Sequence, residues 1–429
     1  MNAPALRPAA AVLVCAVALA GCGKSAPLSS SATSGPIAQV STAGAGGLAT
    51  KNTTRLGGAN PVIDAAAVAR AVYPGLTAGS RPQAIVLVND GDWSAALVAS
   101  TLASAPLGAP LLYSEGSALP AVSAQALAAM HPTGDGEAGG AQVIRIGAPA
   151  AAPATPAGYR TTTLLASEPA ALAAAVARFA GRAHGVAPRQ VIVVSDSAPP
   201  ALAMPAAGLS AESGAPILLV GPTSVPAATS SELAALHRPT IYVIGPSALH
   251  SGVFAELARF GAVKRIGGAS GEEARAGGNG VGGNPIQNAI AVARFADGSF
   301  GWGIHEPGHG LVFVNPSRPL DAPAAAPLSA SGDFGPLLLL DTASSSTGSS
   351  PAGGSTPGTS IPPELTTYLS DIKPAYSPQV PPVRSVYNHG WLIGDEQAIS
   401  AVTQAELDTL LEITPSATAT EEPSLPLAE

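Results

Sequence analysis

The sequence has 429 residues and a formal net charge of −8 at pH 7, with 46% hydrophobic and only 11% charged residues. This length allows a large core and predicts about two or three domains. A nucleic-acid-binding protein is disfavoured, because the chain has no Lys/Arg-rich run that could neutralise phosphates. The 48 glycines and 42 prolines predict long irregular connections between the ordered elements.

The first 22 residues have the pattern of an export signal. Arg7 supplies a short positive start, and residues 9–20 form an apolar run too short to span a bilayer comfortably. The run ends in Leu-Ala-Gly-Cys22, which resembles the lipobox of bacterial lipoproteins, whose Cys becomes the lipid-modified first residue. We therefore expect a signal peptide over residues 1–22 and lipid attachment at Cys22. The alternatives are an ordinary secretory signal and a membrane span. Cys15 would leave with the signal, so the folded part has no Cys for a disulfide or a metal.

Residues 23–52 are rich in Ser, Gly and Ala, which predicts a flexible tether with a span of roughly 30 Å. Beyond it, one motif recurs three times, with Pro at a fixed place and Ala-Val-Ala-Arg ending nine residues later. We interpret each copy as the start of a helix, because Pro suits the first helical position and Asn is a good cap before it. The copies are NPVIDAAAVAR (60–70), EPAALAAAVAR (168–178) and NPIQNAIAVAR (284–294).

Short apolar runs follow each motif in the same order, separated by helical segments. Buried strands alternating with helices predict an α/β fold of doubly wound, Rossmann-like repeats with right-handed crossovers. The predicted strands are AIVLVND (84–90), GAPLLYS (108–114) and QVIRIG (142–147) in the first repeat; QVIVVSD (190–196), GAPILLV (214–220) and TIYVIG (240–245) in the second; and GLVFVN (310–315), FGPLLLLD (334–341) and GWLIG (390–394) in the third.

The repeats occupy residues 53–150, 151–262 and 263–412. Two low-complexity insertions, near 268–283 and 344–360, and a polar acidic tail over 413–429 are predicted to be disordered from their composition.

The first repeat carries a family resemblance. RLGGAN from Arg55 to Asn60, then DAAAVAR, AIVLVNDGDWSAAL, GAPLLYSEGSALP and VIRIG, resembles the cell wall binding repeat 2 family of Gram-positive surface proteins. Members of this family carry three tandem copies, and the resemblance covers about residues 53–412. It implies three α/β repeats around a pseudo-threefold axis, which hold a surface protein noncovalently to anionic wall polymers.

One segment matches a catalytic motif. His305-Glu306-Pro-Gly-His309 fits the H-E-x-x-H signature of zinc proteases. That chemistry needs both histidines on one face of a helix, and Pro307 and Gly308 disfavour a helix there. We expect a loop without a bound metal.

Two further features are weak signals. GGNGVGG (277–283) lacks the Lys-Ser/Thr of a phosphate-binding loop, so no nucleotide cofactor is expected. Asp90 and Asp92 lie on one turn and are interpreted as solvated or helix-capping residues in preference to paired catalytic carboxylates. We therefore expect a protein that is not an enzyme.

Candidate binding residues come from topology. In parallel sheets, ligands bind beyond the carboxyl ends of the strands, and each repeat also opens with an arginine that could hold a phosphate or carboxylate in bidentate fashion. For these arginines, structural ion pairs are the equal alternative. Trp93, Trp302 and Trp391 could stack on sugars, although a partly buried core role is favoured. The predicted polymer contacts are Arg55, Arg160, Arg265, Asn89, Asp90, Ser195, Asp196, Asn315 and Arg318.

Together these features predict an extracytoplasmic protein, anchored to the cell membrane by its N-terminal lipid and facing the cell wall. It would bind an anionic wall or surface polymer or glycan through its three repeats, without a cofactor, a metal or nucleic acid. The main alternative is the solute-binding lipoprotein of a transporter, which would have two lobes and a cleft. A wall hydrolase is the second alternative, but no acid/base constellation remains for it once the repeats are assigned.

Overall fold

The computed structural model describes residues 48–267, 283–330, 335–342, 359–376 and 386–415. The predicted signal peptide, nearly all of the tether, most of both insertions and most of the acidic tail lie outside these residues. The chain is ordered slightly earlier than expected, because Asn52 donates from its backbone N–H to Asp408 Oδ1 over 2.7 Å. None of the helices within the described residues is long and apolar enough to cross a membrane.

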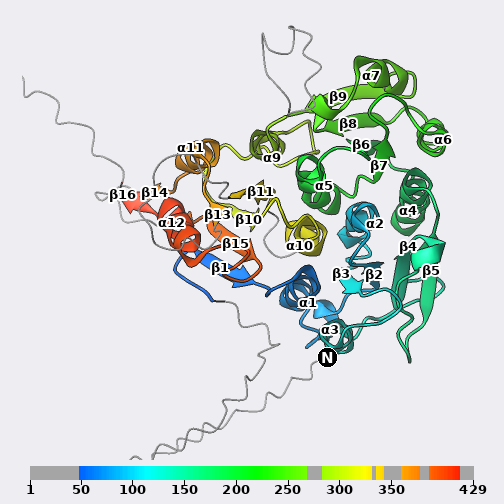
Figure 1. Ribbon diagram of the computed structural model, residues 1–429, viewed down its shortest axis with the longest axis horizontal. Helices are drawn as coiled ribbons and strands as arrows, with labels where there is room; N and C mark the ends of the chain where they lie inside the picture. The colour runs from blue at the N-terminus through cyan, green and yellow to red at the C-terminus, as the bar shows by residue number, and fades with distance from the viewer. Residues whose placement is uncertain (1–47, 268–282, 331–334, 343–358, 377–385, 416–429) are drawn as a thin grey trace, which may run out of the picture. The chain divides into compact units, whose positions relative to one another are not determined.

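Three four-stranded parallel sheets form the framework (Figure 1), which confirms the predicted α/β fold of repeated units. Every strand predicted from the apolar runs is present. The two predicted to begin at Gly108 and Gly214 begin three residues later, after Gly-Ala-Pro, and the one predicted over 334–341 spans only Leu337–Leu339. In spatial order, the first sheet contains β3 (Leu111–Ser114), β2 (Ile85–Asn89), β4 (Val143–Gly147) and β5 (Thr161–Leu165); the second β7 (Ile217–Val220), β6 (Gln190–Ser195), β8 (Thr240–Ile244) and β9 (Ala262–Ile266); and the third β11 (Leu337–Leu339), β10 (Gly310–Val314), β15 (His389–Ile393) and β1 (Thr53–Leu56).

The fourth strand of each sheet comes from the opening of the next sequence repeat. β5 and β9 each end one sheet and lead into the first helix of the following repeat. At the start of the chain, β1 pairs in parallel with β15 of the last repeat, so that the first and third repeats are joined by backbone hydrogen bonds. The boundaries of the sheets therefore differ from those of the sequence repeats by one strand.

The recurrent motif forms the first helix of each repeat, as predicted. These helices are α1 (Pro61–Val72), α4 (Pro169–His184) and α9 (Pro285–Arg294), and each begins at its proline. The Asn60 side chain accepts a hydrogen bond from Ile63 N over 3.1 Å, and Asn284 caps α9 in the same way. Glu168 makes no capping bond with its side chain, consistent with its weak preference for that position.

A second set of helices lies between the sheets (Figure 1): α2 (Trp93–Ala99), continued by the 3-10 turn η2 (Ser100–Ala103), α5 (Pro200–Ser213) and α10 (Asp321–Ala330). One alanine from each, Ala103, Ala211 and Ala326, meets the others in a small apolar cluster. Contact is close because the residues are small. A Cβ added at Gly208 of α5 would lie 2.7 Å from the Ser329 hydroxyl of α10. The Ala-rich composition thus permits these three helices to pack against one another.

Contacts between repeats form a closed cycle. The first helix of each repeat packs on the central helix of the repeat before it: α4 on α2, α9 on α5, and α1 on α10. It also packs beside the strand corresponding to β3 in its own repeat. This cyclic set of contacts is what a pseudo-threefold arrangement of the repeats predicts.

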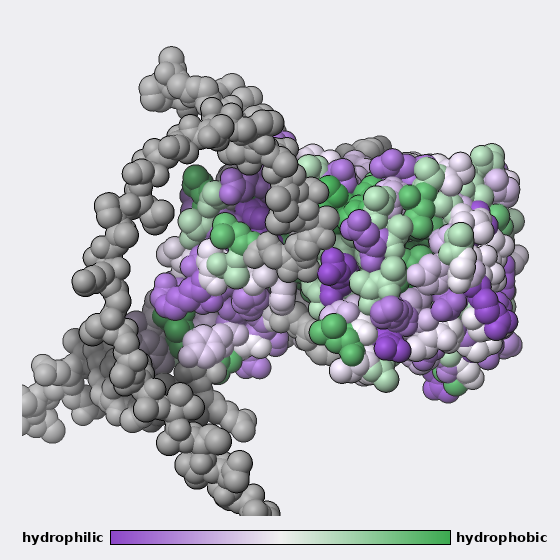
Figure 2. All heavy atoms as spheres, turned by 90° about the horizontal axis from the view of Figure 1, so that it is seen from below, coloured by the Kyte–Doolittle hydropathy of each residue, from purple (hydrophilic) through white to green (hydrophobic). Residues whose placement is uncertain are grey.

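The remaining helices are α3 (Ala121–Met130) after β3, α6 (Ala227–Ala235) after β7, α7 (Ser251–Leu257), α11 (Pro363–Asp371) and α12 (Ala401–Leu411). Short 3-10 turns span η1 (Ala78–Ser80), η3 (Pro149–Ala151) and η4 (Pro246–Ala248). Two small pairings add β12 (Asp341–Thr342) to β13 (Thr359–Ser360), and β14 (Ala375–Tyr376) to β16 (Thr414–Pro415). Figure 2 shows apolar and polar residues interspersed over the described part of one face.

Candidate functional site

The carboxyl ends of the second strands define three equivalent turns. Asn89, Ser195 and Asn315 occupy corresponding positions. Each lies three residues after the strand residue whose backbone N–H donates to the proline before β3, β7 or β11. In each sheet the next strand in the chain (β3, β7 or β11) lies on one side of this strand, and the one after it (β4, β8 or β15) lies on the other. Parallel α/β sheets usually bind ligands at such a change of direction. The predicted contacts Asn89, Ser195 and Asn315 are therefore structurally equivalent. Their surroundings, however, differ between the repeats.

In the first repeat the polar side chains Asn89 and Asp92 of this turn are hydrogen-bonded to nearby backbone N–H groups. The side-chain oxygen of Asn89 accepts a hydrogen bond from Gly116 N over 3.2 Å. Asp92 accepts one from Ala95 N over 3.0 Å and so caps helix α2, as expected for a capping carboxylate. Asp90 is half-buried, with its backbone N–H bonded to Ser114 O.

In the second repeat the turn retains an unsatisfied group. Ser195 is buried at 8% exposure, and its hydroxyl has no hydrogen-bond partner among the residues that the structure describes. Pro222 occupies the position corresponding to Gly116 and cannot donate a backbone hydrogen bond. Asp196 next to it is exposed.

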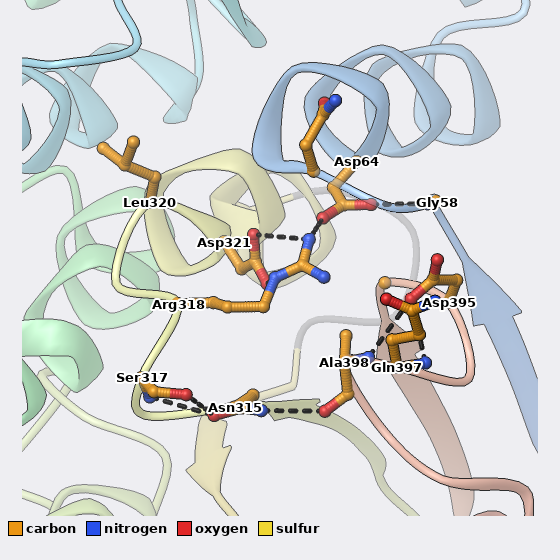
Figure 3. A network of polar contacts seen from close by, with 12 residues as sticks. Gly58, Asp64, Asn315, Ser317, Arg318, Leu320, Asp321, Asp395, Gln397 and Ala398 are labelled. Atoms are coloured by element: carbon orange, nitrogen blue, oxygen red, sulfur yellow. Dashed lines mark hydrogen bonds and ion pairs between the residues drawn. The ribbon is translucent and has the colours of Figure 1, made fainter. Parts of the chain in front are cut away.

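In the third repeat the turn is part of a buried ionic cluster (Figure 3). The Arg318 side chain lies between Asp64 of α1 and Asp321 of α10, both of which are fully buried. Arg318 Nη2 donates to Asp64 Oδ2, and Arg318 Nε lies 2.9 Å from Asp321 Oδ2 in an ion-pair contact without hydrogen-bond geometry. The cluster joins the first and third repeats at the contact between α1 and α10.

Neighbouring backbone and amide groups complete this junction. The second Asp64 oxygen accepts a hydrogen bond from Gly58 N over 2.6 Å. Asn315 donates to Ala398 O over 2.8 Å, which fixes the loop after β15. Gly57 has a φ of +116°, and a Cβ there would lie 2.1 Å from Asp64 Oδ1, so the turn beside the cluster requires glycine.

The cluster contains two carboxyls and one arginine in a buried place, and this composition sets its protonation. Burial raises the pKa of Asp64, and the charge of nearby Asp321 raises it further, whereas Arg318 opposes the shift. Burial also raises the pKa of Asp321, again opposed by Arg318. The pair of carboxyls therefore retains a proton more readily than two exposed aspartates would.

Arg55 has a structural position. It is buried at 6% exposure, and its five N–H donors are all used: Nε and Nη2 donate to Gln404 Oε1, Nη1 to the carbonyls of Gly394 and Asp395, and Nη2 also to the carbonyl of Ile399. Burial lowers the pKa of its guanidinium. The predicted polymer contact at Arg55 is therefore corrected: no donor of this side chain is left to face a polymer.

Arg160 is not the structural counterpart of Arg55. Pairing with the third strand of each sheet makes Arg55, Thr163 and Arg265 equivalent, and places Arg160 three residues earlier. Arg160 is exposed and donates to Gly139 O over 2.6 Å. The predicted set of three repeat-related arginines is corrected on this point, because the second repeat has a threonine at this place.

Arg265 is exposed, and its guanidinium carbon lies 3.8 Å from the centre of the Phe254 ring. The structure thus keeps Arg160 and Arg265 accessible on different sheets and does not bring them together with Arg55. The three tryptophans are half-buried against the core, as the favoured interpretation expected.

The H-E-x-x-H segment forms a loop before β10, as predicted. The His305 ring lies 3.1 Å from the carbonyl oxygen of Arg294, and His309 donates from its backbone to Asn388 Oδ1 over 3.1 Å. In the described part of the chain, no group of three or more His, Cys, Asp or Glu side chains is placed to hold a metal.

Sequence reasoning missed one hollow in the surface, at the end of α4. Arg178 and Arg182 line it with Glu232 of α6 and Glu137 of the first repeat, around a volume of about 380 Å³. Arg178 belongs to the recurrent motif, and the only further signal in the sequence is a second arginine one helical turn later. The cleft is lined by groups of both charges and by small apolar residues.

Comparisons with known proteins support the fold. No family model matches the sequence, and no curated protein matches it. Solved structures similar to this chain include Cwp6 from Clostridium difficile, with a TM-score of 0.62 and 18% identity, and Cwp8 from Clostridium difficile, with a TM-score of 0.58 and 15% identity, each over 84% of this chain. The chain spans about half the length of both proteins, 48% and 52% respectively. At this level of identity the likeness shows a shared fold.

Proposed function

We propose that this chain is a non-catalytic lipoprotein of the cell surface that binds an anionic wall or surface polymer through its three α/β repeats. The observation that carries the proposal is the three-sheet architecture, which is similar to the cell wall proteins Cwp6 and Cwp8 over 84% of the chain. The sequence resemblance to cell wall binding repeats points to the same role. The lipobox at Cys22 would attach the chain to the membrane and leave the repeats facing the wall.

The geometry of the strand-end turns supports a non-catalytic role. In an α/β enzyme these turns commonly present the reacting groups. Here Asp92 caps a helix, and Arg318 is paired with the carboxyl groups of two buried aspartates. The capping bond stabilises α2, and the ion pair between Arg318 and Asp64 joins the first and third repeats, so these side chains are not free to exchange protons with a substrate.

The solute-binding alternative predicted two lobes joined by hinge strands. The described residues instead form three related sheets whose helices contact one another in a cycle. This arrangement favours an extended ligand that meets several repeats over a small solute enclosed between two lobes.

A sedimentation assay tests the proposal. The full-length protein, purified in detergent, would be mixed with isolated cell envelopes before and after chemical removal of their anionic polymers. We expect the protein to sediment with intact envelopes at low salt, and to do so less as salt screens charge contacts over a Debye length of about 10 Å at 0.1 M. Equal binding to stripped envelopes, or no binding at low salt, would contradict the proposal.

A further inference from the structure

The cleft at the junction of the first two repeats contains two arginines, one held by an ion pair and one without an ion pair to another described residue. Arg178 Nη1 lies 2.8 Å from Glu232 Oε2, and the Glu232 side chain is only 4% exposed whereas that of Arg178 is 53% exposed. The buried carboxylate thus holds the guanidinium in place while part of it remains accessible. A guanidinium positioned in this way loses little side-chain entropy when it binds a ligand.

Arg182 follows one helical turn after Arg178, so both side chains leave the same face of α4. Its guanidinium carbon lies 5.8 Å from the centre of the Phe179 ring, and it forms no ion pair with another described residue. Arg182 therefore supplies a positive charge in the cleft that the protein does not neutralise. Its position in the last turn also suits the helix dipole, and this alternative role is tested below.

The rest of the lining is apolar or accepts hydrogen bonds. The end of α4 is covered by few side-chain atoms, because Gly181, Gly185 and Pro188 line the cleft there. Val186 is 69% exposed. Glu137 reaches the cleft from the loop before β4 in the first repeat. Because the Glu137 carboxylate forms no ion pair or hydrogen bond with the other described residues, it is free to accept hydrogen bonds from hydroxyl groups.

These groups match one chemical class. We propose that the cleft binds a saccharide unit carrying an anionic substituent, with Arg178 and Arg182 donating to the phosphate or carboxylate. Glu137 accepts from sugar hydroxyls, and the apolar surface around Val186 and Pro188 contacts the ring. The inference rests on the proposed function and identifies the repeat junction at which the polymer is held. The second repeat is singled out because Pro74 and Gly298 occupy the positions of Arg182 in the other two copies.

The test measures binding of two defined anionic oligomers, poly(glycerol phosphate) and oligogalacturonate, to the full chain by isothermal titration calorimetry. The two probes distinguish phosphate from carboxylate as the recognised group, and neutral dextran is the control ligand. We expect Arg182→Ala to weaken binding about tenfold or more, as for loss of a charge-assisted hydrogen bond. Arg182→Lys should bind with intermediate affinity, because it keeps the charge and loses the planar fork.

Two further variants separate binding from folding. Val186→Trp fills the cleft from an exposed position without changing charge and should also weaken binding. Arg259→Ala removes an exposed arginine outside the cleft and should bind as wild type does. A role of Arg182 in helix stability alone predicts a lower melting temperature with unchanged affinity.

The outcomes distinguish the two proposals. If wild type binds an oligomer while Arg182→Ala and Val186→Trp bind equally well, the cleft is wrong and the wider function stands. If wild type binds neither oligomer nor isolated envelopes, both proposals are wrong.

Discussion

Replacing Arg55 by methionine tests whether this side chain closes the structure or contacts a ligand. Methionine keeps an apolar stem and removes five donors that serve three backbone carbonyls and Gln404 Oε1. A hydrogen bond from a charged group contributes about 1.5–3 kcal/mol, and an orphaned buried acceptor costs about 1–3 kcal/mol. The variant also avoids the cost of burying a charge, which offsets part of this loss. We expect the free energy of unfolding to fall on the order of 3–5 kcal/mol in total.

Urea denaturation followed by tryptophan fluorescence measures this loss, because Trp391 on β15 pairs with Thr54 next to Arg55. Total stabilities of domains are about 5–15 kcal/mol, so the change should be large enough to resolve. Arg265→Met is the matched control, since its exposed position predicts a change of less than about 1 kcal/mol. An Arg55→Met protein that unfolds like wild type, or one of full stability that no longer binds envelopes, would refute the structural role.

Three other predictions concern the repeat junction and the anchor. Because the folded-state pKa values of Asp64 and Asp321 are raised, the folded protein binds more protons than the unfolded chain between about pH 4 and about pH 9, and its stability should fall as pH rises through this range. Asp64→Asn should flatten this dependence in urea titrations between acidic and alkaline pH; an unchanged slope would argue against it. Gly57→Ala should destabilise by about 2 kcal/mol or more, because of its φ of +116° and the contact with Asp64, whereas Gly79→Ala meets nothing within 4 Å and should be neutral; equal melting temperatures would contradict this. Cys22→Ala should release the protein from membranes or leave the precursor uncleaved, and unchanged processing and partition on fractionated cells would count against lipidation.

The repeated strands and first helices were predictable because their signals are local. Apolar β-branched runs bounded by turns gave β2, β6 and β10, and proline at the first helical position gave α1 and α4. Helices between the apolar runs were predicted from the order of the repeats, but the local sequence signal for the central helices α5 and α10 is weak. Each contains an internal proline, Pro205 or Pro327, which disfavours a helix in isolation. Nearly complete burial between the sheets compensates for the lost backbone hydrogen bond. This stabilisation comes from tertiary contacts, which local sequence patterns do not show.

The candidate site was harder to predict than the fold. The sequence around Arg55, which is followed by Leu56 and two glycines, does not indicate whether its side chain is buried or exposed. Arg55 is buried because β1 pairs with β15 of the last repeat. The misplaced equivalence of Arg160 has a similar cause, since strand register is not visible in the sequence. The cleft near Arg182 depends on a glutamate from another repeat, and one sequence cannot show that proximity.

The central claim is that the three repeats bind an anionic wall polymer independently of the lipid. The most direct measurement replaces residues 1–22 with a cleavable secretory signal, so that residues 23–429 are exported without an anchor, and follows the protein in wall and medium fractions of whole cells. We predict retention in the wall at low salt and release at high salt, where the Debye length falls to about 3 Å at 1 M. Complete loss of the unanchored protein to the medium at low salt would contradict the claim.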